Sequence, residues 1–418
     1  MLFNAGGLSL FCLGIGCAFS QAIHPDWRFN RLWMINTTAS GANVSGTVTH
    51  IPVVVRLKAG NFDFTQARDH GEDIRFFKLS GVPIPFQIER WDKVARVAEI
   101  WIKMDTVFGN RVYPAFSMDW GNASAPEAGA PSQVFDTADG YAGVWHLSET
   151  GNTDPDGYRD ATSMAANGQG KNLTAANATE GIVGTGHYFH PNRSGGQSIM
   201  IKPLTRSDFD FTGPMALACW IKLESKDGVM RYPLVGKGEG AWRLYRSNAQ
   251  TLEFCVNQDG KGPNGKDHDC VGTGNHFGGP PAWAFVVGVN EGSRLKIYIN
   301  GLKDGDTATY GTPVKNRETV WLGENNQGGY FRGYMDEVQI LRGSRNADWV
   351  KLSFESQRTD GKLLSYSASA ALLRSGMEEH NRVDGNSMRL RKDILGRGFK
   401  KSPTFILHRE RDLGPTFP

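Results

Sequence analysis

Alternating hydrophobic and polar residues recur along most of the chain and predict an all-β protein. In residues 295–301, Leu295, Ile297 and Ile299 share one face of a strand, and Asn300-Gly301 fits a type I′ hairpin turn. Similar runs separated by turns rich in Gly, Asn and Asp predict strands at 51–57, 97–104, 215–223, 242–246, 252–256 and 283–289. Apolar residues at helical spacing predict a helix at 347–357. Many short strands with so little helix indicate β-sandwiches.

A connector divides the strands into two series. Residues 122–133 are small and interrupted by two prolines, which is typical of a domain boundary. We therefore predict two β-sandwich domains, one at residues 31–135 and a second, a jelly roll, at residues 141–358. Residues 359–418 lose the alternation and carry 11 Lys and Arg against 7 Asp and Glu, which predicts a basic, largely disordered tail.

The first residues predict export. Residues 1–22 contain no charge, and the apolar run at 8–19 is too short to span a bilayer. Ala18-Phe19-Ser20 has the small-x-small pattern of a signal-peptide cleavage site, although no Lys or Arg precedes the apolar run. We expect a secreted, periplasmic or cell-surface protein with no transmembrane segment after the signal. An ordinary buried N-terminus is the alternative.

Charge and cysteine content restrict the partners and the chemistry. The formal net charge is +3, and the residues before 359 sum to −1, so no large basic field predicts nucleic-acid binding. Cys255 and Cys270 lie fifteen positions apart across a Gly/Asn/Asp loop, and they form either a disulfide or two free thiols. Cys219 lies in an apolar run and is expected in the core.

Short motifs in both series resemble known families. Gly143-Val-Trp-His-Leu147, Ala218-Cys-Trp-Ile-Lys222 and Gly333-Tyr-Met-Asp-Glu-Val338 resemble the laminin-G-like, concanavalin A-like jelly rolls of bacterial surface proteins. Glu99-Ile-Trp-Ile102 and Trp120-Gly-Asn-Ala-Ser124 resemble an uncharacterised bacterial β-domain, a domain of unknown function that often precedes such a jelly roll. In some bacteria this pair of domains is fused to a proton-channel subunit of the TolQ/ExbB type.

The jelly-roll resemblance extends to β-glucanases, so we searched the sequence for catalytic motifs. Those enzymes carry Glu-x-Asp-x-x-Glu or Glu-x-Asp-x-Glu on one strand, so that both glutamates face the cleft. The chain contains no such run, no Gly-x-Ser-x-Gly elbow, no phosphate-binding loop and no His-Glu-x-x-His helix. We expect no enzymatic activity, and a divergent glycosidase is the alternative.

Asp336 is the candidate metal ligand. Alternation places it on one face with Tyr334, Val338 and Ile340, and it places Glu337 on the other face. A carboxylate among apolar groups needs a cation or several hydrogen-bond donors. The resemblance implies a structural calcium held by Asp336 and by backbone carbonyls near Gly143. A salt bridge, or hydrogen bonds from loop amides, is the alternative.

Aromatic residues beside polar ones are the candidates for ligand binding, because sugars stack on aromatic faces. The candidates are Tyr330 and Phe331 near Asn325, together with Trp242 and Tyr245. We therefore expect a non-catalytic cell-envelope protein whose jelly roll binds a polysaccharide or surface glycan. Two alternatives are an adhesive or structural module that binds envelope proteins and the extracytoplasmic part of a TolQ/ExbB-type transport system.

Overall fold

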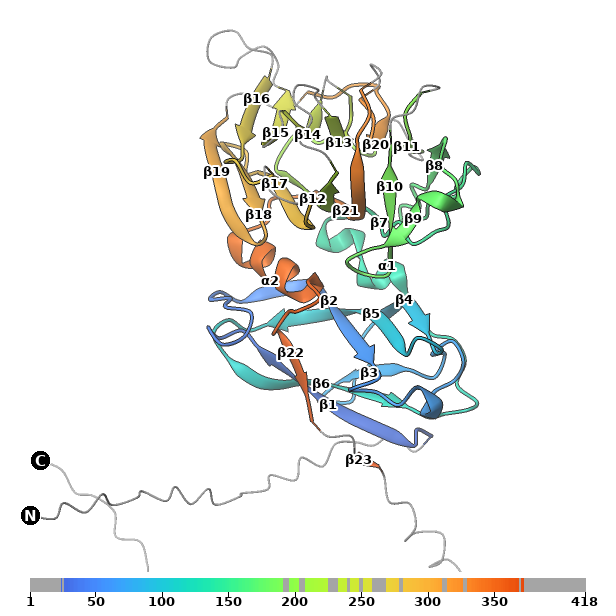
Figure 1. Cartoon of the computed structure of the whole chain (residues 1–418). Coiled ribbons are helices and arrows are strands. Elements are labelled where there is room, and N and C mark those ends of the chain that lie inside the picture. The colour runs from blue at the N-terminus through green and yellow to red at the C-terminus, as the bar shows by residue number, and fades with distance from the viewer. Residues whose placement is uncertain are drawn as a thin grey trace, which may run out of the picture. The chain divides into compact units, whose positions relative to one another are not determined.

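Strands of two β-sandwiches make up almost all of the regular structure in a computed structural model of the chain (Figure 1). The predicted signal peptide and most of the predicted tail lie outside the residues that the structure describes. The described residues are 24, 26–190, 195–202, 207–224, 232–238, 241–247, 251–257, 268–277, 281–309, 314–325, 329–367 and 370–371.

The first sandwich consists of two antiparallel sheets. One sheet has the order β22-β1-β6-β3 and the other has the order β2-β5-β4. The strands are β1 (Phe29–Asn36), β2 (Val48–Lys58), β3 (Arg75–Lys78), β4 (Phe86–Asp92), β5 (Val97–Val107), β6 (Val112–Trp120) and β22 (Leu364–Tyr366). Trp33, Val53, Ile100 and Phe116 are among the buried residues that join the two sheets. Residues 51–55 of β2 and 98–102 of β5 are buried at consecutive positions, so both faces of these strands are covered.

The chain returns to this first sandwich after the jelly roll. Strand β22 pairs with β1, with Leu364 opposite Ile35, and β23 (Ala370–Ala371) pairs with the start of β1. The prediction of a largely disordered segment from residue 359 is therefore wrong for these residues. The reason is non-local, because β1 offers an open edge whose backbone groups need partners.

The second sandwich contains an eight-stranded and a seven-stranded sheet. The eight-stranded sheet has the order β19-β18-β17-β12-β21-β10-β9, with β7 also paired to β21, and the seven-stranded sheet has the order β16-β15-β14-β13-β20-β11-β8. The strands of the eight-stranded sheet are β7 (Tyr141–Trp145), β9 (Ala178–Glu180), β10 (Thr185–Phe189), β12 (Met215–Leu223), β17 (Ala284–Asn290), β18 (Arg294–Ile299), β19 (Leu302–Ala308) and β21 (Gly333–Arg342). Those of the seven-stranded sheet are β8 (Gly168–Lys171), β11 (Ser198–Ile201), β13 (Tyr232–Gly236), β14 (Trp242–Arg246), β15 (Leu252–Asn257), β16 (His268–Gly272) and β20 (Val320–Leu322). This all-β architecture with two sandwiches confirms the predicted fold class.

Local predictions in this domain are confirmed at the hairpin and the helix. Asn300 and Gly301 have φ angles of +51° and +80°, as a type I′ turn between β18 and β19 requires. Helix α2 spans Ala347–Gln357, and its N-cap Asn346 accepts a hydrogen bond from the amide of Trp349 at 2.8 Å. The short helix α1 (Pro131–Val134) lies in the predicted connector.

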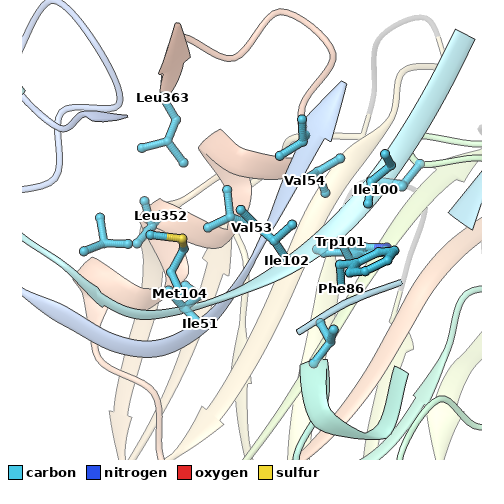
Figure 2. Packing of buried hydrophobic residues seen from close by; sticks show 14 of the residues in the cluster. Ile51, Val53, Val54, Phe86, Ile100, Trp101, Ile102, Met104, Leu352 and Leu363 are labelled. Carbon is cyan, nitrogen blue, oxygen red and sulfur yellow. The ribbon is translucent and has the colours of Figure 1, made fainter. Parts of the chain in front are cut away.

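Helix α2 packs between the two sandwiches. Along β12, Cys219 faces the interior of the jelly roll, whereas Trp220 faces outward, where its ring stacks on Phe354 at 5.7 Å. On its other side the helix contacts the first sandwich, where Leu352 lies beside Ile51 and Met104 (Figure 2). The outer face of the eight-stranded sheet is thus covered by apolar contacts.

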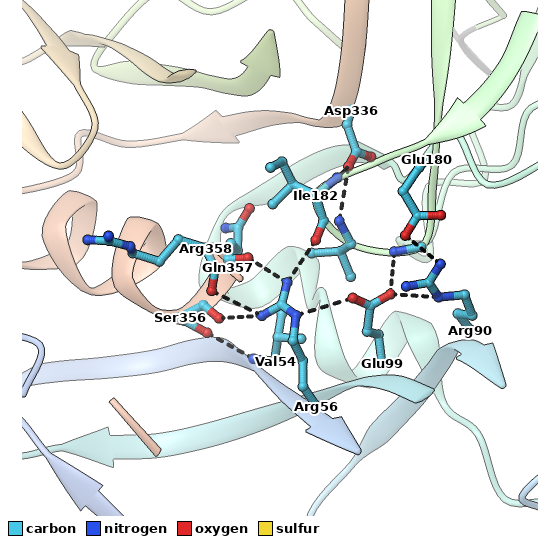
Figure 3. A network of polar contacts seen from close by, with 12 residues as sticks. Val54, Arg56, Arg90, Glu99, Glu180, Ile182, Asp336, Ser356, Gln357 and Arg358 are labelled. Atoms are coloured by element: carbon cyan, nitrogen blue, oxygen red, sulfur yellow. Dashed lines mark hydrogen bonds and ion pairs between the residues drawn. The ribbon is translucent and has the colours of Figure 1, made fainter. Parts of the chain in front are cut away.

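A half-buried arginine joins the same elements by polar contacts (Figure 3). Arg56 in β2 donates to the carbonyls of Ser356 and Gln357 at the end of α2, at 3.2 and 2.5 Å, and to the carbonyl of Ile182 at 2.8 Å. It also pairs with Glu99 at 3.2 Å. The last carbonyls of a helix have no partners within the helix, so Arg56 satisfies groups that burial would otherwise leave unpaired.

Candidate functional site

The outer face of the seven-stranded sheet carries the polar and aromatic side chains that a ligand needs. Val320 and Leu322 of β20 point into the jelly-roll core, so Trp321 between them points outward and is half-buried. In the same way Ile199 and Ile201 of β11 are in the core, while Ser198 lies on the outer face. Since α2 and the first sandwich cover the other sheet, we take this face as the candidate site.

Lys171 at the end of β8 is the centre of a small cluster on this face. Its Nζ lies 3.0 Å from Glu324 Oε2 and donates to the Tyr330 hydroxyl at 3.2 Å. The same ammonium lies 5.2 Å from the centre of the Tyr330 ring and 5.7 Å from that of Trp321, both within cation–π range. Ser198 Oγ also donates to Glu324 Oε2, at 2.8 Å. The cluster thus holds two aromatic rings around one ion pair.

The electrostatics of the cluster keep Lys171 charged. Partial burial opposes the charge, but hydrogen bonds to Glu324 and Tyr330 outweigh it and raise the pKa of Lys171. The Glu324 carboxylate is buried and accepts bonds from both Lys171 and Ser198. Its oxygens therefore serve to position the cation beside the rings. Such a surface can stack a sugar ring and donate hydrogen bonds to its hydroxyls.

The structure brings only some of the predicted ligand residues together. Tyr330 belongs to the Lys171 cluster. Asn325 and Tyr245 line a depression of about 10 Å³ with Arg243 and Glu324, hardly more room than one water molecule requires. No preformed sugar pocket exists at this point of the described surface.

Three of the predicted ligand residues are buried, which contradicts their expected exposure. Phe331 is 0% exposed, because its amide bonds to the Gly323 carbonyl and its ring turns into the jelly-roll core. Trp242 is 1% exposed, and its indole donates to the Phe209 carbonyl. Tyr245 is 5% exposed, and its hydroxyl is bonded to Glu253.

The sequence interpretation missed Trp321. The available signal was the triplet Val320-Trp-Leu322, in which strand alternation assigns the central residue to the face opposite the two aliphatic ones. Three residues are too short a pattern to identify a strand without its neighbours, β11 and β13.

Asp336 lies in a different environment from the predicted one. Strand β21 contains a β-bulge, so that Glu337 and Val338 stand opposite Cys219 alone, and Glu337 adopts a φ of +51°. The extra residue reverses the alternation. Asp336 therefore does not share a face with Val338 and Ile340, and both Asp336 and Glu337 are fully buried.

The residues around Asp336 do not fit calcium. Its Oδ2 accepts hydrogen bonds from the amides of Ile182 and Val183, at 2.6 and 3.1 Å, and these contacts are N–H donors, whereas calcium binds several oxygen ligands. Gly143 pairs with Ile340, four positions along β21 and roughly 13 Å from Asp336. The predicted juxtaposition of Asp336 and Gly143 is therefore wrong. Asp336 instead binds the backbone amides of Ile182 and Val183, in the loop between β9 and β10.

The two cysteines of the predicted pair are bonded. Cys255 of β15 and Cys270 of β16 lie directly opposite each other and form a disulfide, and Cys219 is a buried free thiol. The disulfide fixes the edge of the seven-stranded sheet.

Comparison with known proteins supports both resemblances. Residues 193–351 match the family model of the concanavalin A-like lectin/glucanases superfamily, and residues 70–148 match that of a domain of unknown function, DUF2341. No curated protein matches the chain. The association with TolQ/ExbB-type channel subunits stays a prediction. Within the described residues, no helix has the length and apolar character to cross a membrane.

Several solved structures align with about half of the chain. The binding domain of botulinum neurotoxin serotype D is 15% identical with a TM-score of 0.39, and the alignment covers 52% of this chain and 52% of that chain. The binding domain of Paraclostridial Mosquitocidal Protein 1 is 18% identical with a TM-score of 0.39, covering 50% and 52%. The chain thus spans about half the length of these structures. At such identities and TM-scores they say nothing about its ligand.

Proposed function

We propose that the protein is an exported, non-catalytic component of the cell envelope that binds a polysaccharide or surface glycan through its jelly roll. The observation that carries this proposal is the Lys171 cluster, with Trp321 and Tyr330 on the sheet face that α2 and the first sandwich leave free. Aromatic rings beside hydrogen-bonding groups are the usual means of binding sugars. The match to the concanavalin A-like model covers Ser198, β20 and Tyr330, whereas Lys171 lies before the first matched residue.

The same geometry explains why we propose binding without catalysis. Retaining glycosidases hold two carboxyl groups about 5 Å apart, one of which acts as nucleophile and the other as acid and base. On this face, Glu324 is bound by Lys171 and Ser198. Glu253, the other outer-face glutamate of the described strands, accepts the Tyr245 hydroxyl bond. Both carboxylates are engaged in holding neighbouring side chains.

The test is binding of the full-length protein to a panel of immobilised polysaccharides. Trp321→Ala is expected to weaken binding at least about tenfold, the equivalent of 1.4 kcal/mol, because a stacking surface is lost. Phe108→Ala is the matched control, since Phe108 is an exposed ring in the first sandwich with Arg111 at 5.6 Å from its centre.

The outcomes separate the candidate functions. Retention on one glycan that Trp321→Ala loses and Phe108→Ala keeps supports the proposal and locates the face. A folded protein that binds no glycan refutes it and favours the adhesive, protein-binding alternative. Release of reducing sugar by the wild type would refute the non-catalytic part.

A further inference from the structure

A buried histidine and two buried glutamates meet where the two sandwiches join. Glu89 lies in β4 of the first sandwich, His146 directly follows β7, and Glu337 lies at the bulge of β21. Their side chains are 2%, 5% and 0% exposed, respectively. His146 Nδ1 lies 2.8 Å from Glu337 Oε2 and 3.5 Å from Glu89 Oε2. One potential ligand atom from each residue lies within 4.8 Å of those of the other two.

The neighbouring Gln87 assigns the protons of the imidazole. Its amide nitrogen donates to Glu89 Oε2 at 3.2 Å, so its carbonyl oxygen faces His146 Nε2 at 3.3 Å. A carbonyl only accepts hydrogen bonds, and Nε2 therefore carries a proton. Nδ1 faces carboxylate oxygens, so either a proton or a metal ion must lie between them. Metal-binding histidines commonly have this arrangement, with one nitrogen on the ion and the other donating to a carbonyl.

The neighbouring arginines form their ion pairs with a different glutamate, although the charge of Arg56 also attracts that of Glu337. Arg56 and Arg90 both pair with Glu99, at 3.2 and 3.0 Å. Glu89 and Glu337 share only His146 as a cationic partner among these contacts, and Glu89 Oε1 is buried with no hydrogen-bond partner in the described structure. Two adjacent carboxylates without a counter-ion are unfavourable in such a place.

We propose that Glu89, His146 and Glu337 bind a divalent transition-metal ion of the zinc class, which ties the first sandwich to the jelly roll. One imidazole nitrogen with carboxylate oxygens is a donor set that zinc accepts. Tetrahedral zinc with bonds of about 2.0–2.2 Å places its ligand atoms roughly 3.3 Å apart. The distances of 2.8–3.5 Å from Nδ1 to the carboxylate oxygens bracket that value.

The experiment measures zinc binding to the full-length protein after chelator treatment, under oxidising conditions that preserve the Cys255–Cys270 disulfide. Calorimetric titration is expected to show one tight zinc ion per chain and an unfolding temperature that rises with bound zinc. Glu89→Gln and His146→Gln should each lower the affinity at least about 100-fold, since loss of an outer-shell partner alone costs 10–100-fold. His187→Gln is the matched control, because His187 is equally buried but bonds to Leu147 and Tyr158.

The wild type decides the question even if a variant fails to fold. Anomalous diffraction from zinc-loaded crystals should place the ion between Glu89, His146 and Glu337. A peak at any other position would overturn the proposal, as would a folded wild type that takes up neither zinc nor cobalt. Affinity that survives in both the Glu89→Gln and His146→Gln variants would also overturn it.

Discussion

The buried imidazole of His187 makes the stability of the jelly roll depend on pH. His187 lies in β10 with no exposed surface. Its Nδ1–H donates to the Leu147 carbonyl at 3.0 Å, and Nε2 accepts from the Tyr158 hydroxyl at 3.3 Å. The Tyr158 oxygen also accepts the Asn152 amide bond at 3.3 Å, so its proton is free for Nε2. Both nitrogens of the neutral ring thus have hydrogen-bond partners. In a protonated ring, the Nε2–H would point at the Tyr158 hydroxyl, which now donates to it.

The size of the effect follows from the shifted pKa. Burial lowers the pKa of His187 from 6.5 to about 4. Between these values the unfolded chain binds a proton that the folded chain does not, so stability is complete above about pH 6.5 and decreases as the pH falls. The loss from this group is about 2.5 kcal/mol at pH 4.5, and it approaches about 3.4 kcal/mol well below pH 4.

The assay is guanidinium-induced unfolding at pH 7.5 and pH 4.5 at constant ionic strength. Other groups also titrate in this range. The informative quantity is therefore the difference between the wild type and His187→Gln in how much free energy of unfolding each loses on acidification. We expect the variant to lose about 2.5 kcal/mol less than the wild type on acidification. His70→Gln, which replaces an exposed histidine, should behave as the wild type does. Equal losses in wild type and His187→Gln would refute the reasoning.

Two further predictions concern residues that are not among the proposed ligands of either candidate site. Arg56→Met should lower the free energy of unfolding by about 3–5 kcal/mol, because it removes one of the two arginines paired with Glu99 and leaves the carbonyls at the end of α2 without this donor. Thermal unfolding measures this, and a loss no greater than that of Lys58→Met, at an exposed site on the same strand, would contradict it. The Cys255–Cys270 disulfide closes a loop of fifteen positions, and its reduction should lower the free energy of unfolding by about 3 kcal/mol. Unfolding with and without reductant measures this difference. Unchanged stability would show that the bond does not restrain the unfolded chain.

The sequence predicted those parts of the fold whose signals are local. The hairpin after β18 was predictable because alternation fixes its buried face and Asn300-Gly301 fixes its turn. Strand β22 carries no such signal. Its three residues form a strand only because β1 has an open edge, and that edge exists only after the first sandwich has folded.

The candidate sites were harder to predict, because they depend on the pairing of distant strands. The bulge opposite Cys219 inserts one residue into β21 and thereby reverses the face of everything before it. Alternation alone therefore assigned Asp336 to the wrong face. For Trp242 the failure was different, since Trp242 and Leu244 alternate with Arg243 in β14 and the pattern already favoured burial. Choosing Trp242 as a ligand candidate overlooked that pattern, although 242–246 was predicted as a strand.

The two proposed sites depend on different physical features and are therefore independently testable. The Lys171 cluster lies on the outer face of the seven-stranded sheet, and its residues come from β8, β20 and the segment after β20. The Glu89 cluster joins residues 57 and 191 positions apart in the sequence, and it exists only when the two sandwiches are in contact. Trp321→Ala should thus leave zinc uptake unchanged, because the sheet face contributes no ligand. Loss of zinc should weaken the contact between the two sandwiches. It should lower the affinity for the glycan only if the glycan contacts both sandwiches. Measuring both properties on both variants therefore tells whether the first sandwich takes part in binding.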